Sequence, residues 1–143
     1  MELPDDPIVE ISPAREKFFG CSGRMLLPSR ATVETFVLAI PAGQLATTDM
    51  LRKAMGAHFQ VEAVCPVTTK KALQAIARDV KTRSPFWRVI KGSGEVMSLF
   101  PGSAAAQAAR LAAEGFVIAA GKILPRVEDF RCLLVQPEEV WKV

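Results

Sequence analysis

Thiols and one imidazole are the side chains of this sequence best suited to covalent or metal chemistry. The 143 residues contain three cysteines and one histidine: Cys21, Cys65, Cys132 and His58. A thiolate is a nucleophile and a metal ligand, but the cysteines form no CxxC pair and His58 lies at no familiar zinc-ligand spacing from them. Their odd number and wide spacing argue against a disulfide framework. We expect free, buried thiols in a reducing compartment, with no metal and no cofactor.

Positive charge is concentrated in residues 66–91. The segment holds seven basic residues and one acidic residue, Asp79, so its net charge is +6, whereas the net charge of the whole chain is +3. They are Lys70, Lys71, Arg78, Lys81, Arg83, Arg88 and Lys91. A basic segment inside a near-neutral protein is typical of a polyanion binder. The alternative is an ordinary solvated helix face.

Three helices are predicted to position this segment. The first covers 29–40 with Ser29 as its N-cap, and the second covers 48–55 after Thr47 or Thr48 and ends at Gly56. The third covers 68–81 and begins at Thr68 or Thr69. Its apolar face is Leu73, Ile76, Ala77 and Val80, and its outer face is Lys71, Gln74, Arg78 and Lys81, with Lys70 beside it. Two short helices, the second basic on its outer side, predict a helix-turn-helix unit.

The rest of the chain predicts small β elements around one more helix. Strands are expected at 86–91 and 95–100 around a turn at 92–94, and at 116–119 and 122–124, with another at 130–135. The helix covers 104–114 after Ser103. Residues 1–28 are predicted to be an irregular arm and 29–143 a single domain, mainly α with small β hairpins. No segment approaches the roughly 20 apolar residues of a membrane span, so we expect a cytoplasmic monomer with no membrane partner.

Three blocks, in order, resemble the DNA-binding domain of alkylguanine-DNA alkyltransferases. Residues 39–56, AIPAGQLATTDMLRKAMG, are similar to the family segment IPxGxxxTYxxLAxxxG. Residues 85–95, PFWRVIKGSGE, are similar to the active-site segment PCHRVVxxxG, and FPGS at 100–103 with LAAEG at 111–115 resembles the last block. CPVTT at 65–69 and PFWR at 85–88 also resemble a bacterial branch with CPxTT and PYWR. The resemblance implies a winged-helix-like helix-turn-helix domain of the alkyltransferase C-terminal type.

The resemblance implies that alkyl transfer is lost. In the family, the cysteine after the proline accepts the alkyl group, and a histidine oriented by a glutamate relays the proton. Phe86 and Trp87 occupy the cysteine and histidine positions, and Glu114 matches the glutamate. We therefore expect no enzyme activity, as in alkyltransferase-like proteins with tryptophan at the acceptor position. The former acceptor site comprises Pro85, Phe86, Trp87, Arg88, Phe100 and Glu114. Its two aromatic rings either stack on a flipped base or fill the old pocket as core.

The family inserts its recognition helix into the minor groove and flips the damaged base. In the family, an arginine of this helix fills the gap that the flipped base leaves in the stack, and a tyrosine of the preceding helix helps to rotate the phosphate. The resemblance places Lys70 or Lys71 at the arginine position and Thr48 at the tyrosine position. Lysine cannot stack or form a planar fork as arginine does, so both contributions to base flipping are weakened. Arg88 matches a family arginine that either contacts DNA or ties the strand to the helix layer. The expected DNA contacts are Thr48, Thr68, Thr69, Lys70, Lys71, Gln74, Arg78 and Lys81.

The expected function is non-catalytic binding of double-stranded DNA. The resemblance extends this to recognition of alkylated guanine without removal of the alkyl group, with downstream repair proteins as further partners. One alternative is a protein-interaction or small-ligand module that kept the fold and lost DNA binding, since fold alone does not fix function. The other is a residual cysteine alkyl acceptor, although none of the three cysteines falls at the acceptor position.

Overall fold

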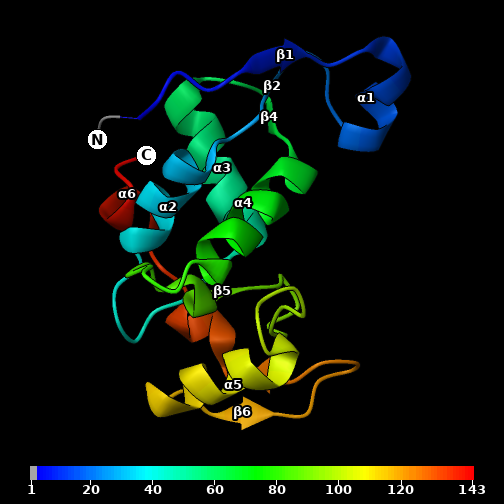
Figure 1. The fold of residues 1–143 in the computed structure, drawn as a ribbon. Helices are drawn as coiled ribbons and strands as arrows, with labels where there is room; N and C mark the ends of the chain where they lie inside the picture. The colour runs from blue at the N-terminus through cyan, green and yellow to red at the C-terminus, as the bar shows by residue number, and fades with distance from the viewer. Residues whose placement is uncertain (1–2) are drawn as a thin grey trace.

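A computed structural model of the chain describes residues 3–143, and its helices are linked by very short strands (Figure 1). The helices are α1 Pro13–Phe19, α2 Arg30–Leu38, α3 Thr48–Phe59, α4 Pro66–Arg78, α5 Ser103–Ala113 and α6 Pro137–Val140. The strands are β1 Ile8–Glu10, β2 Arg24–Leu26, β3 Ala46–Thr47, β4 Ala63–Val64, β5 Val89–Ile90, β6 Ile118–Ala119 and β7 Arg126–Val127. Two short 3-10 helices, η1 Phe86–Arg88 and η2 Phe130–Leu133, complete the fold.

The predicted caps of the first two helices are confirmed. Ser29 accepts a hydrogen bond from the Thr32 N–H at 3.3 Å, and Thr47 accepts one from the Met50 N–H at 3.1 Å. Each bond satisfies one of the orphan donors at the start of a helix. Apolar side chains from α2, α3 and α4 then pack into one cluster, in which the Phe36 and Leu73 side chains are fully buried.

Several predicted helix boundaries are wrong. α3 continues through Gly56, which is buried, and ends at Phe59 with Gln60 in the left-handed region at φ 55°. α4 begins at Pro66, because a proline is tolerated in the first turn. It ends at Arg78, so Val80 lies beyond the helix and is 97% exposed instead of buried.

The N-terminal arm is more ordered than predicted. β1 pairs with β2 antiparallel, and β2 pairs with β4 in parallel, so the arm adds two strands beside the helix-turn-helix unit. The short helix α1 lies between β1 and β2 and projects from the body (Figure 1). The prediction of an irregular segment over 1–28 was wrong, because its backbone groups pair with the distant strand β4.

The first predicted hairpin is also wrong. The predicted turn at 92–94 is present, and the Lys91 N–H donates to the Glu95 carbonyl across it at 2.9 Å. Beyond the turn the strands separate, because β5 pairs in parallel with β3, with Val89 opposite Ala46. The return segment is held by other partners, since the Val96 N–H donates to the Pro125 carbonyl at 2.8 Å and the Met97 N–H to the Gln107 side chain at 2.7 Å.

Around α5, the second hairpin forms between β6 and β7, farther along the chain than predicted. Residues 130–133 form η2 where a strand was predicted. Gly102, rather than Ser103, is the N-cap of α5.

A second apolar cluster lies beneath α5, formed by Leu45, Ile90, Val96, Leu111, Phe116, Val127 and Phe130. The chain then returns to the first cluster, where the Trp141 indole N–H donates to the Phe36 carbonyl at 2.8 Å. Of the helices in the described residues, none combines the length and hydropathy of a membrane span.

Candidate nucleic-acid interface

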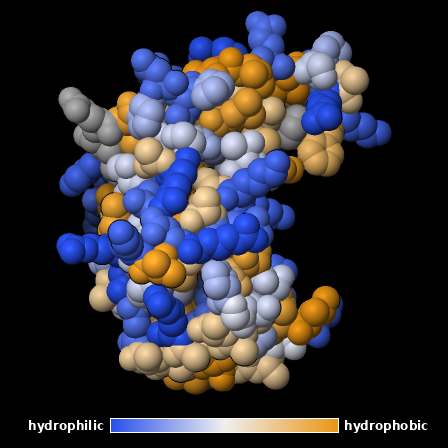
Figure 2. All heavy atoms as spheres, in the orientation of Figure 1, coloured by the Kyte–Doolittle hydropathy of each residue, from blue (hydrophilic) through white to orange (hydrophobic). Residues whose placement is uncertain are grey.

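The helix-turn-helix unit consists of α3, the turn containing β4, and α4. α4 packs on the core through the buried side chains of Thr69, Ala72, Leu73 and Ile76. Its opposite side carries Lys70, Lys71 and Arg78, all exposed, and Lys81 and Arg83 follow its end with exposed side chains. Figure 2 shows hydrophilic side chains crossing the middle of the molecule, over the region where Figure 1 places α4. The basic outer face predicted from the sequence is therefore present and open to solvent.

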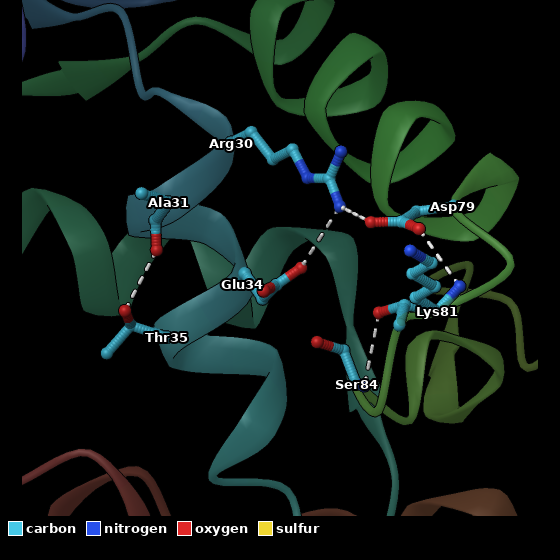
Figure 3. A network of polar contacts seen from close by, with 8 residues as sticks. Arg30, Ala31, Glu34, Thr35, Asp79, Lys81 and Ser84 are labelled. Atoms are coloured by element: carbon cyan, nitrogen blue, oxygen red, sulfur yellow. Dashed lines mark hydrogen bonds and ion pairs between the residues drawn. The ribbon is translucent and has the colours of Figure 1, made fainter.

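The acid in this basic segment is already paired. Arg30 of α2 donates to the Asp79 carboxylate at 2.6 Å, and the Lys81 N–H donates to its other oxygen at 2.9 Å (Figure 3). The Lys81 N–H and then the Arg30 guanidinium hold the pKa of Asp79 below its ordinary value of 3.8. The pair links the end of α4 to α2 at the surface, where the two side chains are 43% and 36% exposed.

Three other predicted contact residues have internal roles. Thr69 is 1% exposed, and its hydroxyl donates to the Cys65 carbonyl at 2.8 Å. The Thr68 hydroxyl donates to the Cys65 thiol at 3.3 Å, and the Gln74 amide donates to the Leu99 carbonyl at 3.5 Å. The burial of Thr69 makes it a packing residue, whereas Thr48 stays partly exposed at the start of α3.

The former acceptor site is nearly filled by its own side chains. Phe86 is 8% exposed, and its ring centroid lies 5.3 Å from that of Trp87 and 5.0 Å from that of Phe100. The cavity beside these rings measures about 30 Å³, far below the roughly 300–1,000 Å³ of small-molecule sites. Of the two interpretations left open by the sequence, the structure favours aromatic side chains that fill the old pocket.

Arg110 of α5 covers the same aromatic cluster from outside. Its guanidinium carbon lies 4.4 Å from the Trp87 ring centroid and 5.4 Å from that of Phe86, both within cation–π range. The sequence analysis missed this residue. The available signal was its position on α5, one helical turn after Gln107, on a helix next to the acceptor segment.

Arg88 has a structural role. Two of its guanidinium nitrogens donate to the Glu114 carboxylate at 3.0 and 2.5 Å, and a third donates to the Ile40 carbonyl at 2.9 Å. The side chains of Arg88 and Glu114 are 13% and 21% exposed. The Arg88 hydrogen bonds hold the pKa of Glu114 below its ordinary value of 4.5, against a smaller opposing effect of burial. Glu114 therefore orients an arginine here, and this arginine ties η1 to the ends of α2 and α5.

Gln107 is a second residue that the sequence analysis missed. It is 3% exposed, accepts from the Met97 N–H, and donates to the Trp87 and Val89 carbonyls at 3.0 and 2.8 Å. It therefore joins the acceptor segment to the segment that follows it. A single glutamine in an alanine-rich helix was the available signal.

The cysteines differ from the expectation of buried thiols. Cys132 is exposed, and Cys21 and Cys65 are partly exposed, all three as free thiols. Partial burial acts to raise the pKa of Cys65, but the Thr68 hydroxyl and the first N–H groups of α4 outweigh it and leave the pKa below 9.0. Within the described residues, no group of histidine, cysteine and carboxylate side chains is arranged to hold a metal ion.

Comparison with solved structures shows that this fold is shared with an S. pombe protein that has been crystallised with DNA. S. pombe ATL in complex with DNA matches with a TM-score of 0.59 at 21% identity, over 76% of this chain and 94% of that chain. S. pombe Atl1 in complex with damaged DNA containing O6-carboxymethylguanine matches with a TM-score of 0.56, at the same identity and coverage. No protein-family model and no curated protein matches the sequence. These matches concern the fold alone, and they confirm the predicted fold class.

Proposed function

We propose that this protein binds double-stranded DNA through the outer face of α4 and carries out no alkyl transfer. The observation that carries the proposal is the exposed basic face of α4, on a fold that S. pombe Atl1 shares in its complex with damaged DNA. Phosphates are neutralised by lysine and arginine with release of counterions, and such contacts supply most sequence-independent affinity. Asp79, the acid near this face, is ion-paired with Arg30, so it does not cancel the positive potential of the lysines and arginines on α4.

The absence of alkyl transfer follows from the chemistry of the acceptor site. Neither the Phe86 ring nor the Trp87 ring can attack carbon, and Glu114 is occupied by Arg88. We extend the proposal to the minor groove as the docking site and to alkylated guanine as the lesion that is bound without being removed. Downstream repair proteins are the further partners of this proposal, and a cytoplasmic monomer remains our expectation.

The test is a titration of labelled duplex, with and without one O6-alkylguanine, at several salt concentrations. The proposal expects log Kobs to fall linearly with log salt, and Lys71→Gln to reduce that slope by about 0.9, the value for one lost phosphate contact. Lys142→Gln, an exposed lysine beyond α6, is the matched control and should leave the slope unchanged. Absence of binding at low salt would contradict the proposal and favour the interaction-module alternative. Equal affinity for both duplexes would contradict the recognition of alkylated guanine and leave the proposal of DNA binding intact.

A further inference from the structure

The helix α1 of the N-terminal arm projects on the side of the molecule where α4 begins (Figure 1). A hollow of about 480 Å³ lies between α1, α3 and the start of α4, with Phe18 and Cys21 in its wall on the arm side and Pro66 on the side of α4. A second hollow, of about 390 Å³, shares Arg52 and Pro66 with the first and continues along the start of α4 to Lys70. Figure 2 shows the outline of the molecule hollowed on this side. α1 therefore borders the same concave side as the basic face of α4.

α1 has no part in the core of the fold. None of its described side chains belongs to either apolar cluster, and the Phe18 side chain is 74% exposed. Its position is nevertheless set by hydrogen bonds at its base. The Ile11 N–H donates to the Gly23 carbonyl at 2.8 Å, where β1 and β2 pair.

The base of the arm is joined to the helix-turn-helix unit itself. β2 pairs in parallel with β4, which lies in the turn between α3 and α4. The Arg24 guanidinium also donates to the Gln60 carbonyl, at the end of α3, at 2.7 Å. These contacts set the position of α1 relative to α3 and α4. A segment that buries little but is held in place on a folded body suits a role in binding.

Arg15 is the cation of α1 that lies near the first turn of α4. Burial acts to raise the pKa of Cys65, the N-cap of α4, and the Thr68 hydroxyl lowers it. The positive charge of Arg15 also lowers this pKa, which requires the guanidinium to lie close to the thiol. The Arg15 side chain is exposed, and among the described residues it forms no ion pair. Its charge is therefore available to an anion from outside.

The carboxylates that line the first hollow have other partners. Asp49 is ion-paired with Arg52 at 3.3 Å and with Lys53 at 3.7 Å. Glu62 accepts from the Arg24 N–H at 2.8 Å. α1 itself, with two basic residues and one acidic residue, has a net charge of +1. The potential next to Arg15 therefore favours an anion.

We propose that α1 is a second DNA-binding element, in which Arg15 contacts a phosphate of the same duplex beside those bound by α4. This inference rests on the proposed function. Each strand of a duplex carries a phosphate about every 3.4 Å along the helix axis, so a strand that lies on the start of α4 offers further phosphates to α1. Arg15, Arg52 and Lys70 follow one another along the concave side, which favours a polyanion with regularly spaced charges over an acidic protein segment. A phosphate contact of this kind adds affinity and positions the duplex, and it reads neither sequence nor lesion.

Arg15→Gln in the full chain tests the inference, and Lys17→Gln is the matched control. Lys17 is exposed on the same helix, but two residues along an α-helix turn its side chain by about 200° from that of Arg15. In titrations of labelled duplex at several salt concentrations, Arg15→Gln should reduce the salt slope by about 0.9, the value for one lost phosphate contact. Lys17→Gln should leave the slope unchanged. In hydroxyl-radical footprints, Arg15→Gln should shorten the protected stretch of DNA at one end.

Lys71→Gln, measured in the same titrations, separates this inference from the proposed function. If Lys71→Gln reduces the salt slope while Arg15→Gln changes neither slope nor footprint, DNA binding through α4 stands and the role of α1 is overturned. Equal losses from Arg15→Gln and Lys17→Gln would also overturn it. If Arg15→Gln weakens the binding of polyglutamate but not that of the duplex, an acidic protein segment is the partner of α1 instead. Absence of duplex binding by the unmodified protein would contradict the proposed function and this inference together. Thermal unfolding of Arg15→Gln should be unchanged, because the side chain is exposed and outside both apolar clusters.

Discussion

Replacing Arg88 by lysine tests whether this arginine holds the fold together or contacts DNA. The guanidinium makes three hydrogen bonds, two to Glu114 and one to the Ile40 carbonyl, from a side chain that is 13% exposed. An ammonium keeps the charge but cannot form the planar fork. We expect Arg88→Lys to keep one bond to Glu114 and to lose the other two.

The magnitude follows from these two lost bonds. A hydrogen bond to a charged group contributes about 1.5–3 kcal/mol, and two such bonds give about 3 kcal/mol at the lower end. Partial exposure lets water replace some of this, because exposed ion pairs contribute only about 0–1 kcal/mol. We therefore expect a loss of about 2–3 kcal/mol in the free energy of unfolding. With a urea m-value of about 2 kcal/mol/M, the midpoint falls by about 1–1.5 M.

The assay is urea unfolding at pH 7, followed by far-UV circular dichroism, with Arg83→Lys as the matched control at an exposed arginine. The second readout removes the charge: duplex titrations of folded Arg88→Gln at several salt concentrations should give the salt slope of the unmodified protein. A loss of stability below about 0.5 kcal/mol in Arg88→Lys together with a reduced salt slope in Arg88→Gln would refute the structural role. That result would make Arg88 a phosphate contact.

Two further predictions use the shifted pKa values. Glu114→Gln should lower the free energy of unfolding at pH 7, and the difference should shrink as the pH falls below about 4.5, because the folded-state pKa of Glu114 is depressed and its stabilisation is lost on protonation. Urea unfolding across this pH range measures the difference, with Glu128→Gln as the exposed control, and a pH-independent difference would contradict it. Iodoacetamide should modify Cys65 with a rate midpoint below pH 9.0, and Thr68→Ala should move that midpoint upward by removing the hydroxyl hydrogen bond. Peptide mass spectrometry follows the reaction, and an unmoved midpoint would exclude the Thr68 contribution.

Local sequence signals were sufficient to predict the three helices that present the basic face. Ser29 and Thr47 are caps whose bonds reach only three residues along the chain, and the apolar spacing of α4 is read within the helix itself. The ends of α3 and α4 were harder to predict. Gly56 remains helical because it is buried against Val64 of the neighbouring strand, a contact that a stop signal in the sequence cannot report.

The pairing of the short strands depends on contacts between distant residues. The turn at 92–94 suggested a hairpin, but Val89 pairs with Ala46, more than 40 residues earlier. The Phe130 ring packs so closely over Gly94 that a Cβ there would lie 2.3 Å from it. No local pattern around 86–100 indicates either partner. The same limit applied to Gln107 and Arg110, whose roles depend on α5 lying against η1.

The aromatic rings at positions 86 and 100 pack the segment 96–100 against the body of the fold. The Phe86 ring lies on Phe100 with a centroid distance of 5.0 Å, and both side chains belong to the first apolar cluster. Leu99 packs against the same cluster, and its carbonyl accepts from the Gln74 amide. Gln107 holds the same segment by bonding to Met97 and to the Trp87 carbonyl at once. A cysteine at position 86 would leave a void beside Phe100, so Phe86→Cys should lower the free energy of unfolding. The ring at position 86, which cannot act as a nucleophile, therefore stabilises the segment that follows it.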